Sequence, residues 1–502
     1  MKDIDMLFVH PSTHCLSLGS RVTDLVTFVT MPIGTIALAD LLERNGYSTK
    51  IFHTGIEQMY NRDFQVEDLF KKCDPRVVGI DLHWFVHSYD AIRIARIAKE
   101  QSNAHVVLGG FTASYFAEEI LSSFDEVDSV IRGDAEVPLL ELMKNLKNER
   151  LSNVPNLTYR RDGSLEVSEM SYIAGEDDLR QLNYTNFKLL SNYDKYHRAI
   201  SQSGDLDPYA WKVNVKRQAW VPLGRGCTVN CSYCGGGSMA HYGLTGRGRP
   251  VFHPTEQVVQ TLSKFEEEGI DATYMDFDPF PDRGYFRKLF EEIRKEKVDI
   301  STEFALWSLS DRGFIRDFAD TFNPLYSTLV MSPESGSEEV RRKNKGFYFG
   351  NEELFRWLRD ARREMVSLEV YFASGLCWET EENFDETINL AKSILDDYPV
   401  VTISCGALVM EPGSPRFKEP EKFGIKLKFG TFADYYKHFM GLAMGLPTET
   451  QLGYDTIWQS ERQIVENSIR FEKMIGTGQP SRWLSLLDGE DVLMFKKLPF
   501  HS

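Results

Sequence analysis

The chain has 502 residues, which is too long for one compact core, so two or three domains are expected. Apolar residues make up 42% and charged residues 26%, an ordinary composition for a globular protein, and the formal net charge is -17. This negative charge argues against non-specific nucleic-acid binding and against attachment to an anionic membrane surface.

The amino-terminal segment and the seven cysteines indicate the compartment. The start "MKDIDMLFVHPSTHC" lacks the basic region and apolar run of a secretory signal. The most apolar long window, residues 25–42, is interrupted by Pro32, Gly34 and Asp40, so no membrane span is expected. We therefore expect a cytoplasmic protein whose cysteines are not paired in a disulfide framework.

Residues 1–148 alternate short apolar runs with helical patterns. Helical spacing of apolar residues is found at 33–46 and 90–100. Strands are expected at 6–9, 49–52, 77–80, 106–110 and 129–131. Such alternation is typical of a Rossmann-like parallel sheet covered on both faces, in which ligands bind beyond the carboxyl ends of the strands.

Residues 149–215 are more irregular and are expected to connect two domains. The segment "NLTYRRDGSLEVSE" predicts a β-hairpin with Asp162 and Gly163 at its turn.

Strand–helix alternation resumes over residues 216–420. Six strands are expected, in "AWVPLG", "ATYMDFD", "TEFALW", "LYSTLVMS", "SLEVYFAS" and "VVTISCGALV". Six successive units predict a partial (β/α)6 barrel, in which the chemistry sits in the loops that follow the strands. Residues 421–502 are expected to be helical, so the fold class is α/β throughout.

The loop after the first of these strands, "LGRGCTVNCSYCGGG", holds Cys227, Cys231 and Cys234. Structural zinc normally has four protein ligands. A cubane iron–sulfur cluster has four irons, each of which takes a terminal ligand. Three thiolates therefore leave one iron open to a substrate or cofactor. A zinc site completed by His241 or His253 is the alternative.

Glycines on both sides of the cysteines fit a tightly wrapped cluster. Gly235 and Gly236 directly follow Cys234. Without side chains they let the backbone approach the cluster, and their amides can donate hydrogen bonds to its sulfides.

The C-x3-C-x-aromatic-C spacing, with Tyr233 as the aromatic, resembles the radical SAM enzymes. In that family the motif binds a [4Fe-4S] cluster, and S-adenosylmethionine (SAM) chelates the unique iron. Electron transfer into the sulfonium then gives methionine and a 5′-deoxyadenosyl radical. Further segments resemble this family in chain order: "GRGRPVFHPTEQVV", "DATYMDFDPF", "SPESGSEEVRRKNKG", "YFASGLCWETEENFDET" and "MEPGSPRF".

The resemblance implies a SAM pocket built from these segments. Glu334 is expected at a SAM hydroxyl or amino group, and Gly375 close to adenine. The full set of cofactor-binding residues expected in this half is Tyr233, Gly235, Gly236, Arg247, Arg249, Asp276, Glu334, Ser335 and Gly375.

Plainer interpretations of these residues remain open. Glu334 fits a helix-capping carboxylate, Gly375 a strand-end turn, Asp276 and Asp278 a solvated pair, and Arg247 and Arg249 surface charges rather than partners of the SAM carboxylate. Two segments depart from the family pattern: "GLCWET", which contains Cys377 and Trp378, and "DFDPF". We therefore expect an unusual substrate side.

The front region, with "MPIGTIALADLLERNGY", "VVLGGFTAS" and "VIRGDAEVPLLELM", resembles the cobalamin-binding domain of cobalamin-dependent radical SAM enzymes. The resemblance implies that Gly109, Gly110 and Thr112 line the nucleotide tail or corrin edge. The D-x-H-x-x-G motif, whose histidine ligates cobalt in many cobalamin enzymes, is missing from the sequence.

Several interpretations of the front domain stay open. One makes His83 or His87 a cobalt ligand, and another makes Trp84 or Phe85 a shield for the lower corrin face. In a third, the domain is degenerate and binds no corrin.

The combined resemblance implies a cobalamin-dependent radical SAM methyltransferase. Its target would be an unactivated sp3 carbon of a small-molecule substrate, and a second SAM would remethylate the cobalt. An external electron donor such as flavodoxin or ferredoxin is expected, and no nucleic-acid partner. One alternative is a non-methylating cyclisation, rearrangement or C–C bond formation with the same cofactors. The other is a non-catalytic iron–sulfur or corrin-binding sensor. The sequence identifies no catalytic side chain.

Overall fold

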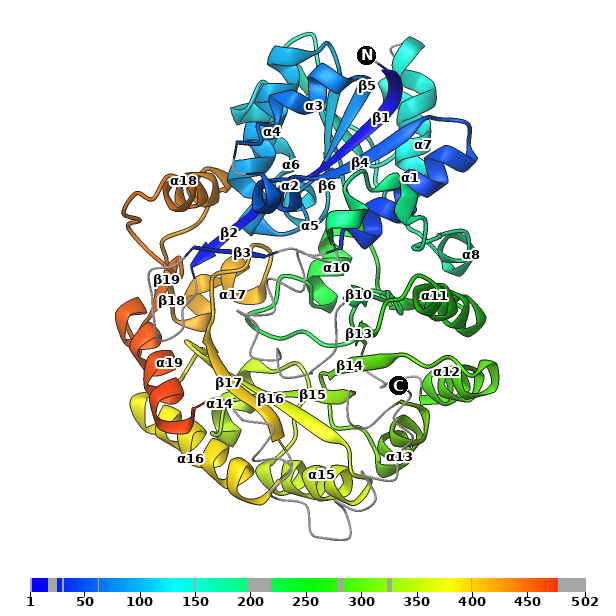
Figure 1. Ribbon diagram of the computed structural model, residues 1–502. Helices are drawn as coiled ribbons and strands as arrows, with labels where there is room; N and C mark the ends of the chain where they lie inside the picture. Colours follow the sequence, from blue (N-terminus) through cyan, green and yellow to red (C-terminus); the bar gives the residue numbers. More distant parts are fainter. Residues whose placement is uncertain are drawn as a thin grey trace.

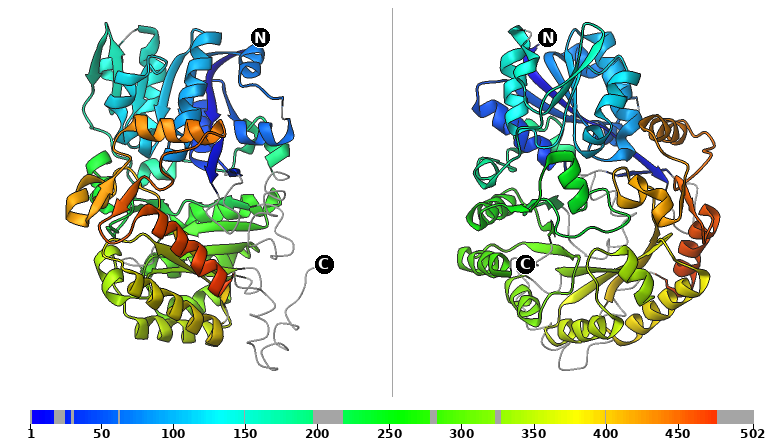
Figure 2. Two further views of the ribbon diagram at one scale, coloured as in Figure 1. Left: turned by 90° about the vertical axis from the view of Figure 1, so that its left-hand side faces the viewer. Right: turned by 180° about the vertical axis from the view of Figure 1, so that it is seen from behind.

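The computed structural model describes residues 2–16, 25–28, 31–61, 63–148, 150–196, 218–277, 283–322, 327–398 and 400–476. Two α/β units are stacked on each other, with the amino-terminal unit above a larger half-barrel (Figure 1). Figure 2 shows the same two layers from the side and from behind. The two-part α/β architecture predicted from the sequence is confirmed.

The first unit is built on a seven-stranded sheet in the order β4-β1-β5-β6-β7-β8-β9. Its first five strands are parallel. Their bounds are β4 (Thr49–His53), β1 (Lys2–His10), β5 (Cys73–Asp81), β6 (His105–Gly109) and β7 (Ser129–Ile131). The strand order reverses between β1 and β5, and in such sheets ligands bind beyond the carboxyl ends of the strands at this point.

Helices cover both faces of this sheet because its strands are apolar on both sides. Met6 packs in one cluster with Leu139, whereas Leu7, next along β1, packs in another with Ile94. Alternate residues of a strand point to opposite faces, so β1 is buried on both. The helices are α1 (Ile33–Arg44), α2 (Thr54–Tyr60), α3 (Glu67–Lys72), α4 (Ser88–Gln101), α5 (Phe111–Tyr115), α6 (Ala117–Ser123) and α7 (Glu136–Asn145). A separate antiparallel pair consists of β2 (Thr13–Leu16) and β3 (Leu25–Phe28).

The expected hairpin is present as β8 (Leu157–Arg161) and β9 (Ser164–Val167). Asp162 and Gly163 have φ angles of 49° and 78°, as a two-residue hairpin turn requires. The hairpin extends the first sheet, because β8 pairs antiparallel with β7. Helix α8 (Glu176–Arg180) follows in the connecting segment, of which residues 149 and 197–217 lie outside the described part.

The second unit is a six-stranded sheet whose strands are parallel and adjacent in chain order. They are β10 (Gln218–Trp220), β13 (Ala272–Asp276), β14 (Ser301–Leu306), β15 (Thr328–Glu334), β16 (Ser367–Ser374) and β17 (Val400–Ala407). The sheet curves into a half-barrel with its long helices outside (Figure 1). These helices are α11 (Thr255–Glu267), α12 (Arg283–Glu296), α13 (Arg312–Thr321), α15 (Asn351–Arg363) and α16 (Glu381–Asp397).

Helix α15 shows why these segments fold as they do. Leu354, Trp357, Leu358 and Ala361 are buried, and their spacing places them on one face of a helix. Its remaining face is charged and solvated.

The carboxyl-terminal region is helical as expected and also contains a short antiparallel pair. It comprises α17 (Pro415–Lys418), β18 (Ile425–Leu427), α18 (Phe432–Ala443), β19 (Tyr454–Thr456) and α19 (Glu461–Ile475). Helix α18 lies beside the first unit, where the Phe85 and Tyr435 rings are 5.5 Å apart, and α19 lies along the half-barrel (Figure 1). Residues 477–502 lie outside the described part. No helix of the described ranges is long and apolar enough to cross a membrane.

Candidate functional site

The three cysteines lie in the loop between β11 (Gly224–Arg225) and α10 (Ser238–Thr245). A backbone N–H donates to each of their sulfurs. Val229 donates to Cys227 Sγ at 3.4 Å, Gly346 to Cys231 Sγ at 3.2 Å and Gly236 to Cys234 Sγ at 3.3 Å. Amide donors favour the thiolate, which is the form that binds metal.

Close packing on two sides sets the shape of this loop. A Cβ on Gly235 would overlap the Pro412 carbonyl oxygen, and a Cβ on Gly346 would overlap the Asn230 amide. Gly235 N also donates to Glu411 Oε2 at 2.6 Å. The cysteine loop is therefore held between the 410–417 segment and the turn after α14 (Glu338–Asn344).

The environment of the thiols favours a bound cation. Burial raises the pKa of Cys234, and Glu411 and the thiols of Cys231 and Cys227 raise it further, so a cation at this place would relieve the repulsion. Within the described ranges, no three His, Cys, Asp or Glu side chains are grouped so that they could hold a metal ion. Three thiolate donors suit a [4Fe-4S] cluster, whose fourth iron takes a ligand from outside the protein.

The two histidines considered as zinc ligands have other contacts. His253 uses one ring nitrogen with Tyr184 Oη at 2.9 Å and the other with Gln257 Oε1 at 3.2 Å. The His241 ring packs edge-on against Phe111, with centroids 4.8 Å apart.

Tyr233 and Glu334 come together beside Cys231. Burial raises the pKa of Tyr233, and the nearby Glu334 carboxylate and Cys231 thiol add to this effect. Glu334 has a φ of 67°, at an irregularity in the pairing of β15 with β16. A left-handed non-glycine residue costs roughly 1–2 kcal/mol, and such strain tends to occur at functional sites. Lys345 Nζ lies 3.5 Å from Glu334 Oε1, with both side chains largely buried.

Ser335 and Gly375 have partners within the protein. Ser335 Oγ accepts from Ser337 N at 3.2 Å. Gly375 has a φ of 83°, and a Cβ there would overlap the Tyr454 hydroxyl. Packing against β19 is therefore enough to require glycine at this position, whatever its distance from adenine.

Asn344, which the sequence did not single out, joins three parts of the site. Its Oδ1 accepts from Ser232 Oγ at 2.6 Å and from Cys377 N at 3.1 Å, and its Nδ2 donates to Cys377 O at 2.8 Å. It thereby connects α14, the cysteine loop and the loop after β16. The sequence signal that could have identified Asn344 is its place in "RRKNKG", inside a segment that resembles the family.

Arg416 is a second such connection. It is fully buried; its N–H donates to Ser232 O at 3.0 Å, and its guanidinium donates to Gly375 O at 3.0 Å and Val409 O at 3.1 Å. Glu379 is also fully buried and accepts from Gly375 N at 3.0 Å. Burial raises the pKa of Glu379 to about 8, so this carboxyl is mostly protonated at neutral pH.

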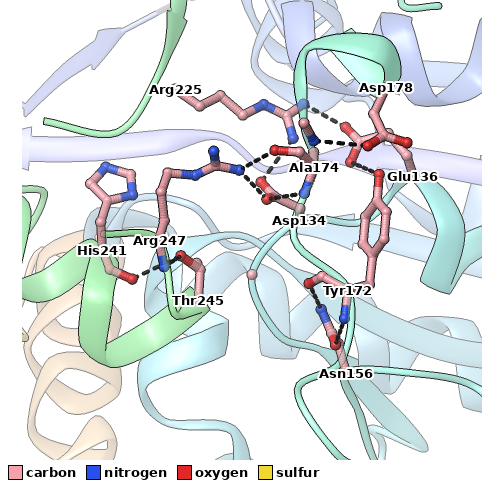
Figure 3. A network of polar contacts seen from close by, with 12 residues as sticks. Asp134, Glu136, Asn156, Tyr172, Ala174, Asp178, Arg225, His241, Thr245 and Arg247 are labelled. Carbon is pink, nitrogen blue, oxygen red and sulfur yellow. Dashed lines mark hydrogen bonds and ion pairs between the residues drawn. The ribbon is translucent and has the colours of Figure 1, made fainter. Parts of the chain in front are cut away.

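Arg247 and Arg249, expected near a SAM carboxylate, differ in burial. Arg247 is buried, and its Nη2 donates to Asp134 Oδ2 at 2.5 Å and to Ala174 O at 2.9 Å (Figure 3). Arg249 is exposed. Asp276 ends β13, and Asp278 lies outside the described residues.

The expected corrin edge of the front domain lies beyond β6. The position of a Cβ on Gly109 has open space around it, whereas a Cβ on Gly110 would overlap the His83 backbone. Thr112 Oγ1 donates to His83 O at 2.9 Å and so fixes the loop after β5. Gly109 is therefore the glycine whose surroundings leave room for a ligand.

The side chains after β5 divide into an exposed group and a buried group. Trp84 is 49% exposed, and its ring meets the His83 ring edge-on with the centroids 5.0 Å apart, so Trp84 is an accessible aromatic side chain. His87 is buried against His10, 5.2 Å away, and burial lowers its pKa to about 3. His10 Nδ1 lies 2.9 Å from Asp81 Oδ2.

Two family models match the chain. The model described as the radical SAM superfamily matches residues 221–391, and the model described as the B12 binding domain matches residues 20–143.

Two curated relatives align over most of the chain. An uncharacterized methyltransferase of Pyrococcus horikoshii is 26% identical over 418 residues, which cover 80% of this chain and 81% of that protein. The anaerobic magnesium-protoporphyrin IX monomethyl ester cyclase of Rubrivivax gelatinosus is 23% identical over 397 residues, which cover 77% of this chain and 65% of that protein.

A solved structure has a similar fold. It is the radical S-adenosylmethionine methyltransferase TsrM from Kitasatospora setae with cobalamin and a [4Fe-4S] cluster bound. The TM-score is 0.67 at 15% identity, and the match covers 98% of this chain and 90% of that one. At this identity the similarity describes the fold.

Proposed function

Because the radical SAM superfamily model matches residues 221–391 and the B12 binding domain model matches residues 20–143 in front of the half-barrel, we propose that this chain is a cobalamin-dependent radical SAM methyltransferase acting on an unactivated carbon of a small molecule. The two domains imply a [4Fe-4S] cluster, SAM and cobalamin. When bound, these cofactors supply one-electron reductive cleavage of the SAM sulfonium and a transferable methyl group. We further propose that an external one-electron donor such as flavodoxin or ferredoxin reduces the cluster.

The chain's own residues divide this work. Cys227, Cys231 and Cys234 would hold the cluster, and the amides of Val229, Gly346 and Gly236 would stabilise their thiolates. Asn344 and Arg416 keep the cysteine loop fixed to the loop after β16. Because these hydrogen bonds hold the loops in position beforehand, the reacting groups need not lose conformational freedom when the substrate binds.

Tyr233 and Glu334 are the groups best placed to contact SAM. Both lie beside Cys231, and Glu334 holds a strained backbone conformation there. In the front domain, the open space at Gly109 and the exposed Trp84 support a corrin site. The observation that carries the proposal is the set of three thiols, each with an amide donor, in the loop that faces the front domain.

The first experiment tests the radical SAM half with SAM and dithionite under anaerobic conditions. Cys231→Ala should lose the brown absorbance of the cluster and the release of 5′-deoxyadenosine. Cys73→Ala is the matched control, because Cys73 is buried in β5 of the other unit. Release of 5′-deoxyadenosine by Cys231→Ala at the wild-type rate would refute the assignment.

The second experiment tests the cobalamin half. Protein given hydroxocobalamin should bind it in near-equal amount and, with methyl-labelled SAM and reductant, should transfer label to the bound corrin. Failure to take up hydroxocobalamin would favour a degenerate front domain. Binding of the corrin without transfer of label would contradict methylation.

A non-methylating reaction is the second candidate. It is favoured by the similarity to the cyclase of Rubrivivax gelatinosus, which aligns over 77% of this chain. Product mass separates the two reactions, because methylation adds one CH2 per turnover and cyclisation adds none.

A further inference from the structure

A network of ion pairs joins the two units at the cysteine loop (Figure 3). Asp134, in the turn between β7 and α7, accepts from Arg225 Nη1 at 2.8 Å and from Arg247 Nη2 at 2.5 Å. Glu136 accepts a second hydrogen bond from Arg225 at 2.5 Å. Asp134 Oδ2 also accepts from Ala174 N at 2.9 Å. The acidic side chains belong to the first unit and the arginines to the second.

Burial makes this network more than a surface contact. The Asp134 side chain is 10% exposed, Glu136 6% and Arg247 5%. The two arginines hold the pKa of Asp134 below its usual range although burial opposes them, so the carboxylate is charged at neutral pH. Buried pairs are sensitive to the loss of one member, because the other charge is then left uncompensated.

The network connects the two cofactor regions directly. Arg225 stands two residues before Cys227, at the start of the cysteine loop. Asp134 follows β7, at the carboxyl edge of the parallel sheet where Gly109 leaves open space. These ion pairs, which we call the clamp, therefore join the start of the cysteine loop to the edge of the sheet where a corrin site is proposed.

Two neighbouring contacts between the units are less directional. A Cβ on Gly133 would lie 3.1 Å from Thr245 Cγ2, and the Phe111 and His241 rings are 4.8 Å apart. Van der Waals and ring contacts of this kind hold the two units together but allow one unit to shift slightly along the other. The two arginines on one carboxylate are directional, so they fix the register of the units.

We propose that Asp134 is a positioning residue, which through Arg225 and Arg247 sets the placement of the corrin-bearing unit relative to the cysteine loop. The expected effect on catalysis rests on the proposed function. Methyl transfer requires the corrin site and the cluster site to be held at a fixed distance and orientation, whereas SAM cleavage requires the half-barrel alone. A misplacement of about 1 Å can cost on the order of 100-fold in rate.

The clamp is tested first in the metal-free protein by hydrogen–deuterium exchange. Asp134→Asn keeps the side-chain shape and removes the charge. We expect exchange at 129–136 and at 223–227 to rise on the order of tenfold or more. Asp162→Asn is the control, because Asp162 is 94% exposed at the hairpin turn. Glu136→Gln removes one of the two negative charges that face Arg225, so exchange should rise at 223–227 and stay unchanged at 245–252. Unchanged exchange in Asp134→Asn at either segment would overturn the clamp.

The consequence is tested in protein loaded with cluster and hydroxocobalamin, with SAM and dithionite as probes. Asp134→Asn should release 5′-deoxyadenosine within about twofold of wild type, while label transfer from SAM to the corrin falls tenfold or more. A proportional loss of both would indicate a merely structural role and overturn the inference, as would normal label transfer. Failure of wild type itself to transfer label would refute the proposed function, and the exchange experiment would still decide the clamp.

Discussion

Replacement of Asn344 by alanine tests whether one amide holds the cysteine loop in place. The side chain is 1% exposed and joins Ser232 to both main-chain groups of Cys377. In Asn344→Ala the Ser232 hydroxyl can turn to another acceptor, but the Cys377 N–H and C=O lose these partners inside the protein. A buried polar group left unpaired costs about 1–3 kcal/mol, so the free energy of unfolding should fall by about 2–6 kcal/mol.

The measurement is a urea titration of the metal-free protein, followed by cluster reconstitution and determination of iron per chain. Asn389→Ala is the matched control, since Asn389 lies on the exposed face of α16 and alanine is a better helix former. The control should change stability by no more than about 0.5 kcal/mol. If Asn344→Ala were as stable as this control and took up iron equally well, the structural role of Asn344 would be refuted.

Two further predictions concern the loop after β16. Gly375→Ala should destabilise the fold by about 2 kcal/mol or more, because a Cβ would overlap the Tyr454 hydroxyl and the φ of 83° is left-handed. Gly406→Ala is the control, because the space around its Cβ is open. Equal melting temperatures of the two variants would contradict the prediction. Glu379→Gln tests the buried carboxyl, whose pKa burial raises from 4.5 to about 8, so that the folded chain keeps a proton that the unfolded chain loses. Wild-type stability should therefore fall as pH rises from about 5 to about 8, by up to about 1.4 kcal/mol per pH unit relative to Glu379→Gln. Paired urea titrations check this, and a difference that does not change with pH would count against it.

The sequence by itself determined the architecture and placed three cysteines in one loop. Strand and helix periodicities are local, since they depend on residues a few positions apart, and the six strands of the half-barrel occur where they were expected. The spacing of Cys227, Cys231 and Cys234 is local too. The hairpin turn at Asp162 and Gly163 was likewise readable from two residues.

Only the tertiary structure decided which polar groups meet. The sequence predicts Arg247 as a partner for a SAM carboxylate, and only the structure shows that its guanidinium binds Asp134, 113 positions away in the chain. The sequence predicts that Gly375 lies close to adenine, and only the structure shows that Tyr454, 79 positions away, packs against it. A periodic pattern shows which face of a strand or helix is apolar. The partner of a buried charge depends on which distant segments the packing brings together, and no local pattern records that.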